Sequence, residues 1–423
     1  MSRAMKDSGH AWLGDIPAHW KVEKFKNLFQ IKKDIAGALG YDVLSVTQKG
    51  IKIKDITKNE GQLAQDYSKY QLVYPNDFAM NHMDLLTGYV DCSTQMGVTS
   101  PDYRTFKAID RNKTVDKYFL RIFQFCYADA IFYKLGQGVS NLGRWRLPAD
   151  QQNRFPLPLP SKEEQQTIAD FLDVKCAEVD EMIALQEKII DELKLYKQSV
   201  ITEVVTKGLN PDAPMKDSGI EWIGEIPGHW EVDILSQLFY EHRHKNVDLI
   251  ETNLLSLSYG KIIRKDINTN EGLLPQSFEG YNILSNGDIV FRLTDLQNDK
   301  SSLRTGLATE GGIITSAYVT IRKREPLNSS YFHYLFHSYD LCKVFYGLGD
   351  GVRQGMNYND LRKILVIIPT LEEQQAIADL LDIKCAEIDE LSNIKQQKID
   401  ELKEYKKSII YEYVTGKKQV KTQ

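Results

Sequence analysis

The chain contains one sequence twice. Residues 5–29 read MKDSGHAWLGDIPAHWKVEKFKNLF and residues 215–239 read MKDSGIEWIGEIPGHWEVDILSQLF, and the two stretches agree at 14 of 25 positions. A second repeat relates SKEEQQTIADFLDVKCAEVDEM at 161–182 to TLEEQQAIADLLDIKCAEIDEL at 370–391. Two joined copies of one unit fold most simply about a pseudo-two-fold axis. The repeat therefore predicts two related folding units.

Length and composition agree with this organisation. The 423 residues, 42% of them hydrophobic, supply two or more domains with cores of their own. No apolar run approaches the roughly 18 residues of a membrane span, and the start lacks a signal peptide's apolar region. We therefore expect a cytoplasmic protein without membrane contact. The five cysteines form no CxxC pair, which predicts neither a disulfide framework nor a zinc site.

The net charge of −5 hides an uneven distribution. Residues 21–160 carry 20 Lys and Arg against 14 Asp and Glu, whereas residues 231–369 carry 15 against 16. The segments 161–209 and 370–416 are acidic, each with 6 basic and 11 acidic residues. Phosphates respond to a local basic face, so the overall charge does not exclude nucleic-acid binding.

The two acidic segments are predicted to be long helices. Each begins with a capping box after a proline, in which Ser161 precedes Glu164 and Thr370 precedes Glu373. Gly208 and Gly416 are natural helix stops. Apolar residues then recur at spacings of three and four, which indicates a heptad seam formed by Ile168, Leu172, Val179, Met182, Ile189, Leu193, Tyr196 and Val200, and by Ile377, Leu381, Ile388, Leu391, Leu402, Tyr405 and Ile409. The repeat symmetry favours an antiparallel pair.

Short apolar runs with Gly, Asn and Asp between them indicate α+β domains on either side of the first helix. We expect a first domain at 1–160, a central long helix at 161–209, a linker and second domain at 210–369, and a C-terminal long helix with a basic tail at 370–423. The domains share a skeleton, since YDVLSVTQKGIKIKDITKNEG from Tyr41 parallels NLLSLSYGKIIRKDINTNEG from Asn253. Loop residues differ between the two domains, as expected for related domains that recognise different sequences.

Two motifs occur in the same order in both halves. W-x-G-x-I-P-x-H-W lies at 12–20 and 222–230, and EEQQ-x-IAD-x-LD lies at 163–173 and 372–382. With this combination the chain resembles the specificity subunit of type I restriction-modification systems over essentially its whole length. The resemblance implies a non-catalytic subunit with two target-recognition domains, each reading one half of a bipartite site on double-stranded DNA.

The resemblance also implies partners. The helices are expected to set the spacer between the half-sites and to dock two methyltransferase subunits, and restriction subunits join the full complex. No cofactor is expected in this chain. S-adenosylmethionine belongs to the methyltransferase subunits, and ATP and Mg belong to the restriction subunits.

Two alternatives stay open, namely a nucleic-acid enzyme that acts alone and a structural coiled-coil protein. The sequence has no Pro-Pro pair, so it lacks the Asn/Asp-Pro-Pro-aromatic motif with which DNA adenine methyltransferases hold the flipped base. The glycine clusters at 135–138 and 347–351 lack a P-loop ending and indicate turns. Asp173 and Asp382 resemble part of a nuclease site, but their place on a helix favours a solvated face.

Two further observations concern side chains that carry no predicted chemistry. His19 and His229 follow the same proline and precede the same tryptophan, which favours a structural role over catalysis. The residues at 241–244 are too closely spaced for a zinc site.

Basic and amide residues in predicted loops are the candidate DNA contacts, because Arg recognises guanine, Asn and Gln recognise adenine, and Lys more often holds phosphate. In the first domain these candidates are Lys32, Lys33, Gln48, Lys49, Lys52, Lys54, Arg104, Asn141, Arg144 and Arg146. In the second domain they are Arg243, Lys245, Tyr259, Lys261, Arg264, Arg292, Arg304, Arg353 and Gln354.

Overall fold

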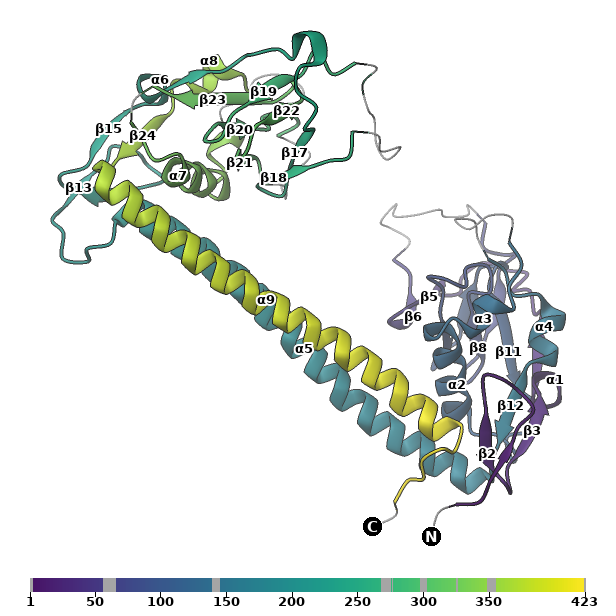
Figure 1. Ribbon diagram of the computed structural model, residues 1–423. Coiled ribbons are helices and arrows are strands. Elements are labelled where there is room, and N and C mark those ends of the chain that lie inside the picture. Colours follow the sequence, from purple (N-terminus) through teal and green to yellow (C-terminus); the bar gives the residue numbers. More distant parts are fainter. Residues whose placement is uncertain are drawn as a thin grey trace. The chain divides into compact units, whose positions relative to one another are not determined.

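The structure, a computed structural model, describes residues 3–55, 66–138, 145–267, 275, 277–296, 303–324, 326–347 and 355–421. Two compact units divide the chain (Figure 1). Unit 1 contains residues 1–187 and 397–423, and unit 2 contains residues 188–396. Each long helix therefore contributes to both units. Among the described residues, no helix is both long and apolar enough to cross a membrane.

Unit 1 is built on a four-stranded antiparallel sheet in the order β4-β11-β8-β9, with α2 against it. A core of phenylalanines fills this interface, and Phe29, Phe106 and Phe123 lie within it, all nearly or fully buried. The elements of the unit are β1 Met5–Asp7, β2 Asp15–Pro17, β3 Lys21–Lys24, α1 Phe25–Leu28, β4 Phe29–Lys32, β5 Leu44–Thr47, β6 Gly50–Ile53, β7 Gln71–Val73, β8 Phe78–Met80, β9 Val90–Cys92, β10 Gly97–Thr99, β11 Arg104–Ala108, α2 Asp116–Ala128, α3 Ile131–Lys134, α4 Ala149–Arg154 and β12 Pro156–Leu159.

Unit 2 repeats this architecture with the sheet order β16-β23-β20-β21 and with α7 in the place of α2. The mixed helices and antiparallel strands of both units confirm the predicted α+β class. The elements are β13 Met215–Asp217, β14 Glu225–Pro227, β15 Glu231–Ile234, α6 Leu235–Leu238, β16 Phe239–Glu241, the 3-10 helix η1 Val247–Leu249, β17 Leu255–Ser258, β18 Lys261–Arg264, β19 Asn282–Leu284, β20 Ile289–Phe291, β21 Thr305–Leu307, β22 Gly312–Ile314, β23 Val319–Lys323, α7 Ser329–Leu341, the 3-10 helix η2 Val344–Gly347, α8 Tyr358–Leu361 and β24 Leu365–Ile368.

The two long helices are α5, Lys162–Lys207, and α9, Leu371–Val414. They run antiparallel within each unit, as predicted. In unit 1 the rings of Phe171 and Tyr413 lie 4.4 Å apart, and Lys406 Nζ lies 2.7 Å from Asp180. In unit 2 the equivalent ion pair joins Lys197 to Asp389 at 2.7 Å.

A buried tryptophan joins the two helices in each unit. In unit 1 the indole Nε1 of Trp20 donates to Glu164 at the start of α5, over 3.3 Å, and the ring lies against Gly416 after the end of α9. Trp230 makes the same two contacts in unit 2, with Glu373 at 3.2 Å and with Gly208. The repeated opening segments therefore clamp the start of one helix to the end of the other.

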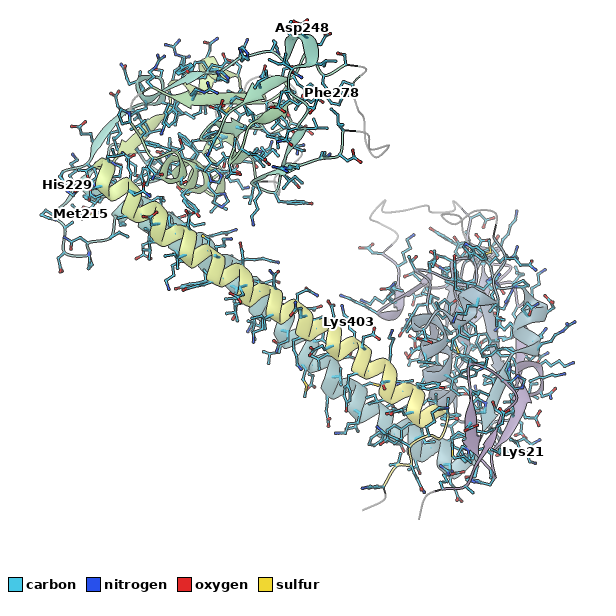
Figure 2. The ribbon with its side chains drawn as sticks, in the orientation of Figure 1. Lys21, Met215, His229, Asp248, Phe278 and Lys403 are labelled. Carbon is cyan, nitrogen blue, oxygen red and sulfur yellow. The ribbon has the colours of Figure 1, made fainter. Side chains whose placement is uncertain are left out.

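The predicted capping boxes are present and serve this clamp. Glu164 accepts hydrogen bonds from the Ser161 amide at 3.3 Å and from His19 at 3.1 Å, and it pairs with Arg3. Figure 2 shows His229 beside the first turn of α9, where its Nε2 lies 2.9 Å from Glu373. The two histidines thus lie in a structural contact.

The glutamine after each capping glutamate holds the adjoining domain helix. The buried Gln165 accepts from the Val115 amide at 2.8 Å and donates to Lys113 O at 2.9 Å, which fixes the start of α2. Gln374 accepts from the Asn328 amide at 3.0 Å and so fixes the start of α7. The EEQQ motif thus connects the long helix, the opening segment and the domain.

The predicted helix seam is wrong at four positions. Met182, Tyr196, Leu391 and Tyr405 are 52%, 56%, 40% and 54% exposed. The inward face passes through Ile183, which is half-buried, because the step after Val179 is four residues rather than three. Apolar spacing alone does not distinguish these two steps on a 3.6-residue helix.

Replacement of the clamping glutamates should lower stability by an amount that depends on pH. Partial burial acts to raise the pKa of Glu164, but hydrogen bonds from His19, Trp20 and Ser161 outweigh it and hold the pKa below the ordinary 4.5. A carboxyl whose pKa is depressed by folding stabilises the fold above its unfolded pKa, and this contribution disappears as the pH falls through its folded pKa. Glu164→Gln should therefore lower the free energy of unfolding by about 1 kcal/mol at pH 7.

The measurement is urea unfolding between pH 3 and pH 8. The difference from the unchanged chain should shrink below pH 4.5, and Glu373→Gln should behave likewise. The exposed neighbour Glu163 provides the control variant Glu163→Gln, whose effect should stay small at every pH. An offset for Glu164→Gln that does not vary with pH contradicts the proposed role of its charge.

Three glycines with the same backbone conformation form a graded test of the clamp. Gly219, Gly208 and Gly416 have φ of +71°, +74° and +73°. A Cβ at Gly219 meets nothing within 4 Å, one at Gly208 lies 3.1 Å from Trp230 Cζ2, and one at Gly416 lies 2.5 Å from Pro17 Cδ. Gly219→Ala should cost about 1 kcal/mol from its backbone alone. Thermal unfolding should rank Gly416→Ala as most destabilising and Gly219→Ala as least; any other order disagrees with the packing.

Candidate nucleic-acid interface

A separate two-stranded hairpin lies against the four-stranded sheet of each domain and carries several of the predicted DNA contacts. In unit 1, β5 pairs with β6, and Gln48 and Lys49 form the exposed tip. Lys52 pairs with Ser45 and points away from the buried Leu44 and Val46. The hairpin thus has one face toward the core and a polar face in solvent.

Unit 2 has the same hairpin with different chemistry at its tip. β17 pairs with β18, and Tyr259 occupies the position of Gln48 with 80% of its surface exposed. Tyr259 and Gly260 have φ of +46° and +79°, as a two-residue hairpin turn of type I′ requires. The unit 1 turn places positive φ only at Gly50. Equivalent strands therefore present different turns and different side chains.

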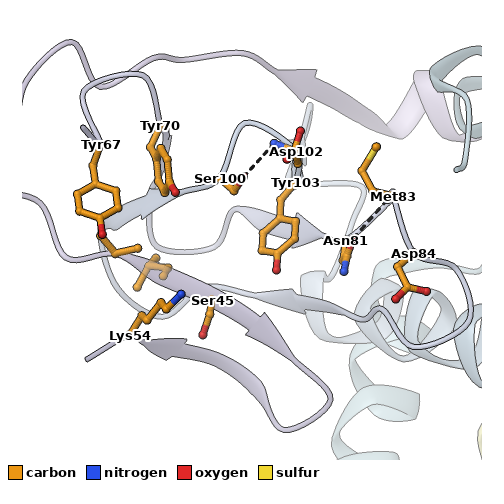
Figure 3. Close-up of a pocket in the computed structure, with 12 residues that line it drawn as sticks. Ser45, Lys54, Tyr67, Tyr70, Asn81, Met83, Asp84, Ser100, Asp102 and Tyr103 are labelled. Atoms are coloured by element: carbon orange, nitrogen blue, oxygen red, sulfur yellow. Dashed lines mark hydrogen bonds between the residues drawn. The ribbon is translucent and has the colours of Figure 1, made fainter. Parts of the chain in front are cut away.

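A cleft of about 280 Å³ lies beside the unit 1 hairpin (Figure 3). Lys54 and Ser45 of the hairpin region line it together with Tyr67, Tyr70 and Tyr103. Burial raises the pKa of Tyr70 and Tyr103 above the ordinary value of 10, so both phenols stay neutral at physiological pH. Aromatic faces and neutral hydroxyl groups suit contact with bases and sugars.

The aromatic residues of this cleft recur in unit 2. The rings of Tyr67 and Tyr70 lie 5.0 Å apart at 81°, and those of Phe278 and Tyr281 lie 5.1 Å apart at 82°. Polar side chains differ between the units at equivalent positions. Asn81 follows β8, and Arg292 follows the equivalent strand β20. Asp102 lies three residues after β10, and Ala317 lies three residues after the equivalent strand β22. These aromatic residues were not among the predicted contacts, although in both units they are spaced three residues apart, which is a usable signal in the sequence.

Several predicted residues are exposed and remain candidates for DNA contact. In unit 1 these are Lys33, Gln48, Lys49, Lys52 and Arg146, with Lys54 half-buried at the cleft. In unit 2 they are Arg243, Lys245, Tyr259, Lys261 and Arg264, with Arg292 half-buried. Asn141, Arg144, Arg353 and Gln354 lie outside the described residues.

Three predicted contacts have buried side chains, and two of them, Lys32 and Arg304, require correction. Lys32 is 9% exposed and pairs with Asp77 at 2.5 Å. Arg304 is fully buried and donates to the carbonyl oxygens of Arg292 and Thr294 over 3.2 and 2.9 Å. Arg104 is 8% exposed and donates to Gln152. Lys32 and Arg304 therefore satisfy interior partners, and Arg104 can be reached only through a pocket.

The remaining cations differ between the units in their pairing. In unit 2, Arg243 lies 2.7 Å from Glu241, Lys261 lies 3.7 Å from Asp389, and Arg264 pairs with Glu310. In unit 1, Lys49 and Lys52 have no ion pair with any residue that the structure describes. The unit 1 hairpin therefore offers a less neutralised surface to phosphates.

The acidic residues that suggested a nuclease site have structural partners. Asp173 pairs with Lys117 and Arg121 of α2, each at 2.8 Å. Asp382 accepts a hydrogen bond from Tyr334 of α7 at 2.7 Å. Within the described part of the chain, no group of three His, Cys, Asp or Glu is arranged to hold a metal ion. These carboxylates connect the long helices to the domains.

Known proteins are similar to this chain in sequence and in fold. A protein named "Putative type I restriction enzyme MjaX specificity subunit", from Methanocaldococcus jannaschii, is 24% identical over 97% of this chain and 96% of its own length. A chain from a structure described as "Structural basis underlying complex assembly and conformational transition of the type I R-M system" has a TM-score of 0.67 at 13% identity and covers 94% of this chain and 98% of that one.

A crystal structure of the HsdS subunit from Thermoanaerobacter tengcongensis is 14% identical, with a TM-score of 0.48, over 95% of this chain and 98% of that one. The model of the family described as "Type I restriction modification DNA specificity domain" matches residues 17–195 and 261–404, well over half of the chain. The repeated domains, the antiparallel helices and this match lead to one conclusion: the chain belongs to the family of type I restriction-modification DNA specificity proteins.

Proposed function

We propose that this chain is the DNA-reading subunit of a type I restriction-modification complex and that each domain reads one half of a bipartite site on double-stranded DNA. One observation carries the proposal. The two domains repeat the same sheet, hairpin and aromatic pair, whereas the side chains at the hairpin tips and beside the cleft differ. A constant framework with different polar edges suits two readers of different base sequences.

The chemistry of the tips agrees with base recognition. Gln48 can donate to and accept from the edge of adenine, and Tyr259 can stack on a base or contact a sugar. Lys49 and Lys52 suit phosphates on either side of the bases. Gln48 and Tyr259 would thus discriminate between bases, and the lysines would position the DNA backbone.

We assign catalysis to partner subunits. Methyl transfer with S-adenosylmethionine would belong to two methyltransferase subunits, and ATP- and Mg-dependent steps would belong to restriction subunits. The support is membership of the family and the lack of a Pro-Pro pair anywhere in the sequence. The chain would then select the site on which its partners act.

The long helices would dock the methyltransferase subunits and set the distance between the half-sites. Equivalent apolar positions on α5 and α9 are exposed to nearly the same extent, with Leu185 and Ile394 at 55% and 51%. Other such pairs are Val174 with Ile383, Met182 with Leu391, and Tyr196 with Tyr405. A surface that occurs twice suits two copies of one partner.

The proposed reading function can be tested by mapping methylated bases across the genome of cells that carry the chain and its partners. A bipartite motif should be present and should disappear when this gene is deleted. Gln48→Ala should relax the motif in one half only, and Tyr259→Ala in the other, by about 1–3 kcal/mol per contact. The exposed Asn112 and Ile250 supply the control variants Asn112→Ala and Ile250→Ala. A motif that survives deletion of the gene rules the proposal out.

The docking surface is tested by charge substitution. Leu185→Glu should remove one methyltransferase subunit from the purified complex, Ile394→Glu should remove the other, and the double variant should remove both. Subunit ratios follow from mass measurement of the intact complex. Leu195→Glu is the matched control, because Leu195 is 66% exposed but its equivalent in α9 is Glu404. If Leu195→Glu causes the same loss, the repeated positions have no special role.

A further inference from the structure

A pocket of about 510 Å³ opens at the start of β11 in unit 1, and it shares no lining residue with the tyrosine cleft. Two arginines, Arg104 and Arg146, line it. Its remaining wall comes from Gln137, Gly138, Pro148 and Ala149. Among the described residues, the lining therefore contains two cations, a neutral amide and no carboxylate.

The guanidinium of Arg104 is held in place by neutral groups. Arg104 is 8% exposed, and its Nη1 donates to Leu147 O over 3.1 Å and to Gln152 Oε1 over 2.6 Å. Gln152 is itself only 2% exposed. Both bonds leave from Nη1, and no residue that the structure describes accepts from Nε or Nη2. An arginine carries five N–H donors, so this cation keeps donors to spare.

The neighbouring Arg146 adds to the excess of positive charge. Burial and then the charge of Arg146 lower the pKa of Arg104 to about 10. Burial, Arg104 and Arg146 lower the pKa of His82 to about 3, and its Nδ1 has no hydrogen-bond partner in the described structure. A buried charge without a counterion is costly to fold. An anion from outside the chain would offset that cost.

The rim of the pocket is fixed by the backbone. Gln137 and Arg146 exchange two hydrogen bonds, of 2.9 Å from the Gln137 amide and 3.0 Å from the Arg146 amide. Beside them, a Cβ at Gly138 would lie 3.0 Å from the Trp145 ring, so glycine allows this indole to pack against the loop. Arg146 is therefore exposed on a backbone whose position relative to Arg104 is set.

We propose that this pocket binds one phosphate of the DNA backbone, with Arg146 reaching it from the rim and Arg104 from the floor. The proposal rests on the DNA-reading function proposed above. A phosphate diester carries one negative charge on two terminal oxygens, which match the paired donors of guanidinium groups. The phosphate would fix the duplex against the first domain while the hairpin and cleft contact bases.

The two arginines have no counterpart at the equivalent described positions of the second domain. Arg104 and Val319 are the first residues of the equivalent strands β11 and β23. Leu147 donates from its amide to His82 O and Met356 donates to Leu293 O, both over 2.9 Å, so Arg146 corresponds to Gly355. The second domain thus has valine and glycine where the first has its two arginines.

The test compares Arg146→Gln with the full-length unchanged chain. Binding to a DNA duplex is measured by fluorescence anisotropy as a function of salt, and thermal unfolding is followed during titration with inorganic phosphate at constant ionic strength. Loss of one phosphate contact should reduce the slope of log K against log salt by about 0.9. The increase in Tm caused by inorganic phosphate should disappear in the same variant. Arg111, 54% exposed and paired with Asp116, provides the control Arg111→Gln, which should change neither quantity.

An unchanged salt slope in Arg146→Gln overturns the proposal, even if inorganic phosphate still stabilises the unchanged chain, because the pocket would then take free anions rather than DNA. Equal stabilisation of Arg146→Gln and the unchanged chain by phosphate overturns it as well. Failure of the reading function looks different, since the methylated motif would then persist after deletion of the gene whatever the behaviour of Arg146.

Discussion

The organisation of each unit depends on one tryptophan between two helix termini. Trp20 and Trp230 are fully buried, and each contacts a carboxylate at the start of one helix and a glycine after the end of the other. Nearby, Tyr118 donates to Val414 O at 2.8 Å and Tyr331 donates to Val205 O at 3.1 Å, so the helix ends are also held by the domains. The W-x-G-x-I-P-x-H-W and EEQQ motifs are therefore two sides of a single contact. This explains why one motif is repeated wherever the other is.

Because this contact fixes the helix termini to each domain, the exposed side chains of the domain can vary. Trp20 of the clamp belongs to the same buried cluster as the phenylalanine core, whereas the hairpin tips at Gln48 and Tyr259 are exposed. Substitution at an exposed tip changes little of the folding free energy, since no buried partner is lost. The same framework can consequently carry an amide and a lysine in one domain and a tyrosine and a glycine in the other. Specificity can then change without loss of the fold.

Features that depend on residues close together in the sequence could be predicted, whereas contacts made only by the fold could not. Capping boxes, helix stops and antiparallel order could be predicted, because Ser161 and Glu164 are three residues apart and the repeat imposes symmetry. Lys32 and Arg304 were misassigned because the sequence does not show whether a long cationic side chain reaches solvent or an internal partner. Only the fold brings Asp77 to Lys32 and Gln152 to Arg104. Met182 was placed in the seam because steps of three and four residues are both compatible with a helix.

The distribution of charge suggests that the two domains contribute unequally to affinity. In the first domain, exposed lysines that pair with no described carboxylate and the Arg104–Arg146 pocket leave positive charge available. In the second domain, Arg243 and Arg264 are engaged by Glu241 and Glu310, and a phosphate would have to compete with those carboxylates. Phosphate contacts supply affinity that depends on salt but carry no sequence information, whereas base contacts discriminate. If the chain reads DNA as proposed, the first domain would contribute most of the phosphate contacts to the duplex. The second domain would depend more on base contacts and on DNA binding by the partner subunits.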